Sequence, residues 1–389
     1  MRKRPAYFHV AASTAPSLNR VGVGLCAALL VFAGEVAAGG WMPLGAEAPS
    51  AAGLGMAYAG TAVRVEDASV VAANPAGLSA LRMTGNQGRV AVGFQSETLR
   101  MEPQVAGVST DNVRQPAGAP SVYLGQSLSS RWAAGLAVTR PYAWETRYGV
   151  SWPGGASRLR VESQRLNPVL AYRVNETLSL GGGVSYQTLS VEQHGAVGYQ
   201  REGAGLGWNV GGLYELSPQM RLGLTYRSQI DHSLAGGLEL GTPAHLTFSV
   251  WQQYSDRWEA SGELSRYRLN GLQGSSATVQ QAAFAHLAGW RFAWGAAYRH
   301  DDRLKSRFGI AVERNPADGS NLASRLGEDH AVWLAAGFRY QLAEKVDSGA
   351  LDFGLAVRWP SRVEIQSVGA QGEYRVGGHV ASVQYSQAY

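Results

Sequence analysis

The feature that most constrains the fold is an alternation of apolar and polar residues with a period of two, which runs from about Gly88 to the C-terminus. One such segment alternates Leu178, Leu180, Val184 and Tyr186 with Ser179, Ser185 and Gln187. Another separates Leu222, Leu224, Tyr226 and Ile230 from Arg221, Thr225, Arg227 and Gln229. A period of two predicts strands that have one apolar face and one polar face.

The length of these segments separates a membrane barrel from a soluble sandwich, which also alternates. Most have ten or more residues, whereas a strand of a globular protein averages five or six and a tilted membrane strand needs about nine to eleven. We predict fourteen strands, near 88–99, 119–129, 131–142, 159–173, 177–192, 204–216, 219–232, 243–255, 257–268, 287–299, 303–313, 330–342, 347–360 and 371–388.

The connections between these strands alternate between two lengths. Short turns are expected at Ser129-Ser130, 174–176, Ser217-Pro218, Asp256, Asp301-Asp302 and 343–346. Longer connections are expected at 100–118, 143–158, 193–203, 233–242, 269–286, 314–329 and 361–370. Short periplasmic turns, long external loops and an even strand count are typical of outer-membrane barrels, and only a closed barrel pairs every strand in hydrocarbon. Residues 87–389 are therefore predicted to form an all-β, transmembrane antiparallel β-barrel of about 14 strands.

Composition agrees with a barrel. Charged residues are 16%, against about 25% in a soluble domain. No apolar run is long enough for a membrane helix. Aromatic residues gather toward strand ends, which predicts interfacial girdles, although aromatics are common in any strand: Trp132, Tyr142, Trp144, Tyr172, Tyr214, Tyr254, Trp258, Tyr340, Trp359 and Tyr385. The terminal Tyr389 predicts recognition by the outer-membrane assembly machinery.

The N-terminus predicts export. A basic region containing Arg2, Lys3, Arg4 and Arg20 precedes an apolar stretch from 21 to 34, and small residues follow it to Ala38. This order indicates a cleaved signal peptide over residues 1–38, too short in its apolar part to span a bilayer. Cys26, the only cysteine, lies within it, so the mature chain is expected to lack disulfides and thiol chemistry. The basic residues there also contribute to the pI near 9.3, so no nucleic-acid partner is inferred.

Residues 39–86 lack the alternation and are rich in glycine, alanine and turn residues. Asn74 before Pro75 predicts an N-cap followed by a proline in the first helical position, and Asp67 can cap the preceding turn. The alternative for both is that these residues simply interrupt the secondary structure at a turn. These residues, about 45 in number, lack a strand pattern and must be accommodated outside the barrel wall. The lumen of a fourteen-stranded barrel is wide enough to hold them.

This segment resembles the N-terminal hatch of outer-membrane transporters for long-chain fatty acids and aromatic hydrocarbons, the FadL/TodX type (OMPP1). The resemblance lies in Gly53 to Gly60, in Asp67 to Ser69, and in Asn74, Pro75, Ala76 and Gly77 with the following leucine. It extends downstream to residues 213–228 and 333–340. It implies a fourteen-stranded barrel plugged by a hatch over 39–86, in which Asp67 and the 74–77 motif shape the hatch. The terminal Tyr389 departs from the phenylalanine of many members.

The resemblance implies passive uptake of hydrophobic compounds across the Gram-negative outer membrane, with long-chain fatty acids as the expected ligand. The ligand is captured near the external loops, moves to a pocket beside the hatch and leaves through the side of the barrel into outer-membrane lipid. We expect the apolar hatch residues to line that pocket or simply to pack the hatch: Trp41, Met42, Leu44, Met56 and Tyr58. Inward-facing Arg227, Arg299, Arg339 and Arg358 can pair with a ligand carboxylate, with lumen acids such as Asp352, or with the hatch.

Other classes of protein are less consistent with the sequence. A lipid-cleaving barrel enzyme needs a serine, histidine and acid in one motif, but seven histidines are scattered through the mature chain. No motif indicates a metal, a cofactor or catalysis. A general porin lacks a plug-like segment, and energised receptors carry a much larger one. Transport of aromatic hydrocarbons or other lipids by the same route, and a general porin, remain the alternatives.

Overall fold

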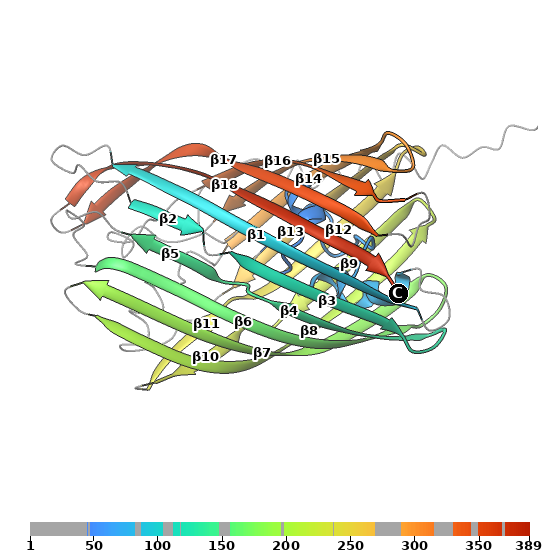
Figure 1. Ribbon diagram of the computed structural model, residues 1–389, viewed down its shortest axis with the longest axis horizontal. Helices are drawn as coiled ribbons and strands as arrows, with labels where there is room; N and C mark the ends of the chain where they lie inside the picture. Colours follow the sequence, from blue (N-terminus) through green and yellow to red (C-terminus); the bar gives the residue numbers. More distant parts are fainter. Residues whose placement is uncertain are drawn as a thin grey trace, which may run out of the picture.

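The structure, a computed structural model, describes residues 45, 47–81, 87–103, 112–116, 118–147, 156–195, 198–235, 237–268, 289–314, 330–343, 349–367 and 370–389. Within them, the chain forms one antiparallel sheet closed into a barrel, and the segment Glu47–Leu81 lies inside it (Figure 1). No helix of the described residues is long and apolar enough to cross a membrane.

The described wall contains eighteen strand segments, of which four pairs are single strands with a short interruption: β2 with β3, β4 with β5, β9 with β10, and β11 with β12. Counted this way, the described residues form fourteen strands, as predicted. The segments are β1 (Gly88–Pro103), β2 (Asn112–Pro116), β3 (Ala119–Ser127), β4 (Trp132–Thr139), β5 (Ala143–Arg147), β6 (Ala156–Arg173), β7 (Leu178–Gly195), β8 (Tyr199–Ser217), β9 (Met220–Arg227), β10 (Ile230–Leu234), β11 (Leu238–Thr242), β12 (Ala244–Gln253), β13 (Trp258–Arg268), β14 (Gly289–Arg299), β15 (Leu304–Arg314), β16 (His330–Gln341), β17 (Ala350–Ser367) and β18 (Ala370–Ala388).

The barrel closes where its first and last strands meet. β1 pairs with β18 along its whole length, from Arg89 opposite Ala388 to Pro103 opposite Tyr374. Gly88 and Tyr389 also exchange two backbone hydrogen bonds, of 2.9 and 3.0 Å. The C-terminus therefore lies at the end of the barrel with the short turns, on the right of Figure 1. Closure leaves the wall without a free sheet edge, the condition for strands in hydrocarbon.

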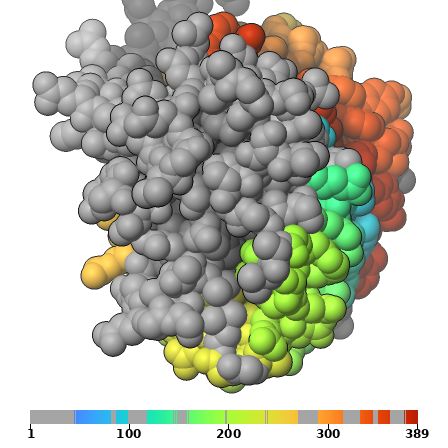
Figure 2. All heavy atoms as spheres, turned by 90° about the vertical axis from the view of Figure 1, so that its left-hand side faces the viewer, coloured from blue at the N-terminus to red at the C-terminus, as the bar shows by residue number. Residues whose placement is uncertain are grey.

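Five of the short turns are where they were predicted, and residues 344–346 of the sixth lie outside the described residues. Several long connections are shorter than predicted. β7 continues to Gly195 and β8 begins at Tyr199, so the expected loop at 193–203 is wrong. The expected loops at 233–242 and 361–370 are wrong for the same reason, because β10, β11 and β17 occupy most of them. In all three places the hydrogen-bonded ladder continues past the residue at which a strand was predicted to end. Figure 2 looks onto this end of the barrel.

Alternation correctly assigns most faces of the wall. Outward apolar side chains such as Val184, Leu206 and Leu355 are exposed, whereas the inward Ser185 and Gln187 are buried. Ile230 was predicted on the outward face with Leu224 and is wrong, because the interruption between β9 and β10 shifts the alternation by one residue. Its side chain is buried against the lumen-facing positions Gly205 and Gly207.

One predicted girdle aromatic is also wrong. Tyr142 lies in the interruption between β4 and β5, where its backbone N–H bonds the Ser163 hydroxyl. Its ring is fully buried and its hydroxyl donates to Glu47 at 2.8 Å. Trp132, Tyr214, Trp258 and Trp359 do project outward and are exposed.

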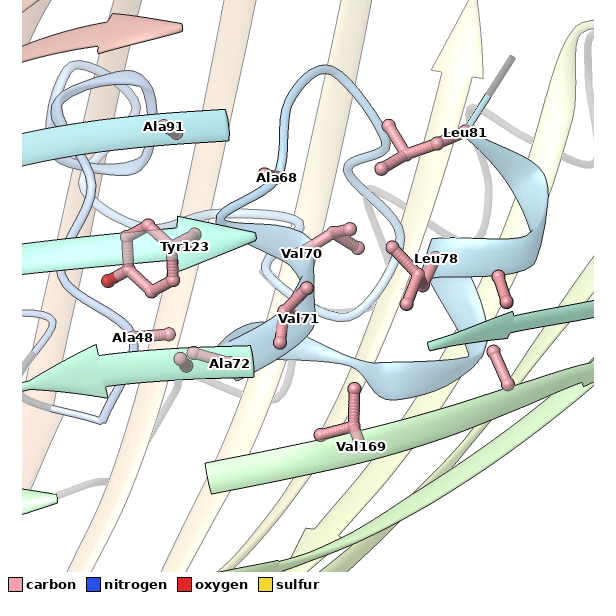
Figure 3. Close-up of a cluster of buried hydrophobic side chains, with 13 residues drawn as sticks. Ala48, Ala68, Val70, Val71, Ala72, Leu78, Leu81, Ala91, Tyr123 and Val169 are labelled. Atoms are coloured by element: carbon pink, nitrogen blue, oxygen red, sulfur yellow. The ribbon is translucent and has the colours of Figure 1, made fainter. Parts of the chain in front are cut away.

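The segment Glu47–Leu81, called here the plug, is built from short helical turns: α2 (Ala51–Leu54), α3 (Val70–Ala73) and the 3-10 helix η1 (Pro75–Ala80). Its apolar side chains pack against the inner face of the wall rather than against one another alone. Val71 and Leu78 meet Tyr123 and Val169 from β3 and β6 (Figure 3). The boundaries predicted for the hatch, at 38/39 and 86/87, involve residues outside those described and remain predictions.

Glycines of the wall allow the backbone of the plug to approach closely. A Cβ on Gly309 would overlap the carbonyl of Met56, and a Cβ on Gly223 would overlap the carbonyl of Ala62. Both glycines occupy lumen-facing positions of strands that lie apart in the wall, β15 and β9. The glycine content, 49 of 389 residues, thus serves in part to seat the plug against the barrel.

Candidate functional site

The predicted hatch motif forms a compact, hydrogen-bonded turn inside the lumen. Asn74 caps η1, because its side-chain oxygen accepts from the N–H of Ala76 at 3.1 Å, and Pro75 occupies the first turn. The side-chain amide of Asn74 donates to the carbonyl oxygens of Ala62 at 2.7 Å and Gly212 at 3.1 Å. Asn74 thereby joins the cap of a helix, another part of the plug and strand β8.

The other motif residues have related structural roles. A carboxylate oxygen of Asp67 accepts from the N–H of Ser69 at 2.8 Å and so caps the turn before α3. Ala76 is fully buried beside Val63 and Leu213. Gly77 leaves room for the side chain of Val70, which a Cβ would overlap. The whole motif is buried, and its contacts set the shape of the plug.

A cluster of partly to fully buried charges, the Glu66 cluster, links the middle of the plug to β13, β15 and β17. Glu66 accepts from Arg307 at 2.8 Å and from Lys305 at 2.6 Å. Arg307 is fully buried and also pairs with Asp352 at 2.6 Å, while Lys305 pairs with Glu259 at 2.5 Å. Burial would raise the pKa of Glu66, but Arg307 and Lys305 outweigh it and hold that pKa well below its usual range. Glu66 is therefore a carboxylate at neutral pH.

A second cluster, the Glu47 cluster, holds the start of the plug. One oxygen of Glu47 lies 2.5 Å from Arg165 and 3.4 Å from the Nε of Arg227, and the other accepts from Tyr142. Burial would raise the pKa of Glu47, but the charges of Arg165, His245 and Arg227 outweigh it and lower that pKa to about 2. Arg227 also donates to the carbonyl of Ala72 at 3.0 Å. Two arginines thus face one carboxylate inside the lumen.

The wall beside the Glu47 cluster is interrupted. The ladder between β3 and β4 ends at Val122 opposite Val138, and the ladder between β2 and β5 begins at Pro116 opposite Trp144. Among the described residues, no backbone hydrogen bond joins the two strands between these points, a region called here the ladder break. Arg140, in the break, donates a side-chain hydrogen bond to the carbonyl of Gly118 at 3.3 Å.

A cavity of about 1100 Å³ lies below the plug at the short-turn end. Charged and polar side chains from the plug, the strands and the turns line most of it, among them Glu66, Arg221, Arg299 and Asp301. Arg221 stacks its guanidinium on Trp251 at 4.1 Å from the ring. Such a lining suits water and ions better than an apolar ligand.

The predicted ligand and arginine positions lie in different parts of the lumen. Met56 packs on the wall, and Tyr58 donates to Gln95 at 2.7 Å. Neither lines the cavity of about 1100 Å³, and Trp41, Met42 and Leu44 lie outside the described residues. Their role in ligand binding stays a prediction.

Of the four predicted arginines, Arg227 and Arg358 are buried and Arg339 pairs with Asp352 at 2.8 Å. Arg299 is exposed at the cavity below the plug. The prediction missed Arg165, Arg307 and their partners on the plug, Glu47 and Glu66. Alternation places Arg165 and Arg307 at inward positions just as it does Arg227, so the same signal would have found them. The described residues bring no three metal-ligating side chains together.

The closed barrel, its apolar outer surface and its polar lumen, which contains the segment Glu47–Leu81, define a transmembrane β-barrel. A family profile described as "Outer membrane protein transport protein (OMPP1/FadL/TodX)" matches residues 29–199 and 195–389. The chain belongs to this family, a family of transport proteins and not a known class of enzyme, and is a protein of the Gram-negative outer membrane.

Individual relatives are distant in sequence but similar over nearly their whole length. The "Long-chain fatty acid transport protein" of Escherichia coli (strain K12) is 24% identical over 396 residues, covering 81% of this chain and 87% of the relative. The "47 kDa outer membrane protein" of Pasteurella multocida is 26% identical over 400 residues, covering 85% and 90%.

Solved structures of related proteins have the same fold. A FadL homologue of Pseudomonas aeruginosa superposes with a TM-score of 0.72 at 16% identity, covering 90% of this chain and 99% of that one. The toluene transporter TodX of P. putida superposes with a TM-score of 0.64 at 15% identity, covering 88% and 99%.

Proposed function

We propose that this chain is a passive outer-membrane channel for hydrophobic compounds, with long-chain fatty acids as its ligands. The ligand enters from the end with the long connections, moves to a pocket beside the plug and leaves laterally through the wall. The observation that carries the proposal is the ladder break beside the Glu47 cluster. It brings an interrupted wall, the start of the plug and two lumen arginines together in one place.

The chemistry of the Glu47 cluster favours a carboxylate ligand over a neutral one. Arg165 and Arg227 present two guanidinium groups to the single carboxylate of Glu47. Guanidinium groups recognise carboxylates through paired N–H donors, which a hydrocarbon lacks. A fatty-acid carboxylate can therefore replace Glu47 on Arg165, which loosens the start of the plug as the ligand arrives.

The lateral exit follows from the surroundings of the plug. The cavity on the periplasmic side is lined by charged groups, which an alkyl chain avoids, whereas Val122 and Val138, outward residues at one edge of the ladder break, are apolar and exposed. A ligand that leaves through the ladder break passes from the lumen directly to this apolar part of the outer surface. Names of relatives support both ligand classes, because one is called a fatty acid transport protein and a structural neighbour is called a toluene transporter.

The test is uptake of oleate and of toluene into liposomes that contain the purified full-length chain. Fatty-acid transport predicts uptake of oleate that falls at least tenfold in Arg165→Gln, whereas toluene transport predicts uptake of toluene that this variant leaves unchanged. A steady large ionic current through the wild-type chain would indicate a general porin and contradict the proposal. Trp41→Ala and Met56→Ala test the pocket, and unchanged oleate affinity in both would remove these residues from it.

A further inference from the structure

A row of two arginines and a tryptophan lies on the outer surface of the barrel, on β13 and β14. The strand register places Arg266 opposite Trp290. Arg268 lies two residues beyond Arg266 on the same face of β13. The guanidinium of Arg266 lies over the Trp290 ring at 4.7 Å, and both Trp290 and Arg268 are exposed.

The row lies at the outer edge of the apolar belt. Trp258 and Tyr298 pack together at 4.7 Å near the short-turn end and mark the opposite edge of the belt. Eight residues separate Trp258 from Arg266 along β13, a height of roughly 20 Å for a strand of ~3.3 Å rise tilted by about 40°. Outward residues between these two levels, such as Phe308 and Ile310 of β15, are apolar and exposed. The basic row therefore lies level with the external headgroups.

The charges of this row are uncompensated among the described residues. Neither Arg266 nor Arg268 has a carboxylate partner there. On the other side of the barrel, farther from the short turns, β6 carries outward arginines that are paired. Arg158 bonds Glu145 at 2.8 Å and Arg160 bonds Glu162 at 2.7 Å. Both surfaces carry exposed arginines, but only the surface on β6 also carries the glutamates that pair with them.

We propose that Arg266, Arg268 and Trp290 form a binding site for the phosphorylated sugar headgroup of lipopolysaccharide, the glycolipid of the outer leaflet. Guanidinium forks match phosphate oxygens, and clusters of arginine beside a membrane attract anionic lipid headgroups. Trp290 provides an amphipathic ring at the interface, against which a sugar can pack. The site continues the membrane-facing wall, so the acyl chains of the same lipid lie on the apolar belt below it. This inference depends on the membrane location alone and not on the ligand of the lumen.

The test compares two double variants of the full-length chain in detergent. Arg266→Gln/Arg268→Gln removes the unpaired charges, and Arg158→Gln/Arg160→Gln removes two paired charges from the matched surface. Binding of lipid A carrying both phosphates, and of its dephosphorylated form, is measured by native mass spectrometry. Heat-modifiable migration in gels verifies that each variant is folded.

We expect the first variant to bind diphosphorylated lipid A roughly tenfold more weakly than wild type, since each arginine near an anionic lipid contributes to attraction. The matched control retains wild-type affinity, and dephosphorylated lipid A binds wild type as weakly as it binds the first variant. Equal affinity of wild type and the first variant overturns the site. Equal losses in the two double variants, or binding that ignores the phosphates, also overturn it.

Discussion

The plug is attached to the barrel at two charged clusters that differ in the wall behind them. At the Glu66 cluster, the ladders from β12 to β17 have no register shift, and each carboxylate has a cationic partner. At the Glu47 cluster, the neighbouring wall contains the ladder break, and one carboxylate is shared between two arginines. The difference indicates that the middle of the plug is fixed, whereas its first residues lie where both the wall and the plug can rearrange.

Arg307→Ala should have the largest effect on the fixed part. It leaves the fully buried Asp352 and the partly buried Glu66 without their shared partner, and breaking a buried ion pair such as Arg307–Asp352 from one side costs about 3–5 kcal/mol. We expect a lower denaturant midpoint for the folded barrel and a current through planar bilayers that wild type lacks. Arg158→Ala, which breaks an outward pair, should cost under about 1 kcal/mol. A closed, fully stable Arg307→Ala barrel would show that the Glu66 cluster does not hold the plug.

Substitutions at lumen-facing glycines of the wall test whether the middle of the plug is fixed by close packing as well as by charge. Gly211→Ala places a Cβ against the Asn74 side chain, whereas Gly212→Ala on the next, outward position meets only Leu180 at 3.7 Å. Overpacking of this kind costs about 1–3 kcal/mol. We expect a lower denaturant midpoint and plug leakage for Gly211→Ala, and wild-type behaviour for Gly212→Ala. Identical midpoints for the two variants would argue against close seating.

Asn74→Ala removes the cap of η1 together with two donor hydrogen bonds, to Ala62 and Gly212. Loss of a cap costs about 1 kcal/mol, and the two unsatisfied carbonyls add to it. We expect a reduced denaturant midpoint and faster proteolysis of the plug. Ser79→Ala is the matched control, since its hydroxyl bonds only Ala76 within the same turn. A loss in Ser79→Ala as large as in Asn74→Ala would mean that the turn, and not the three contacts of Asn74, is responsible.

The sequence predicts the wall better than it predicts the plug contacts. Period-two alternation, strand length and loop parity were sufficient for a closed barrel of fourteen strands. Alternation failed at Tyr142 and Ile230, where an interruption within a strand shifts the face of every later residue by one. Such interruptions have no signature in hydrophobicity, because their residues are as mixed as those of a turn.

Within the lumen, the sequence identified Asn74 as a cap because capping depends on residues that are adjacent in the chain. It could not pair Glu47 with Arg165 or Glu66 with Arg307, since these partners are separated by 118 and 241 residues. Their pairing depends on how the plug is rotated inside the barrel. The lumen-facing glycines of the wall and the apolar faces of α3 and η1 together determine that rotation. Neither shows, in the residues adjacent to it in the sequence, which part of the molecule it will contact.

Acid should weaken the attachment of the plug at the Glu47 cluster. This is the smallest of the expected effects, because it is absent at physiological pH. Because the pKa of Glu47 lies near 2, below the unfolded value of about 4.3, its attraction to Arg165 stabilises the plugged state above roughly pH 4 and is lost as the pH falls toward 2. Proteolysis by pepsin at pH 4 and pH 2 should show the start of the plug released only at the lower value. Glu47→Gln should release it at both. If wild type is cleaved equally at pH 4 and pH 2, the start of the plug is not held by this charge, and the contrast between the two clusters rests on the ladder break alone.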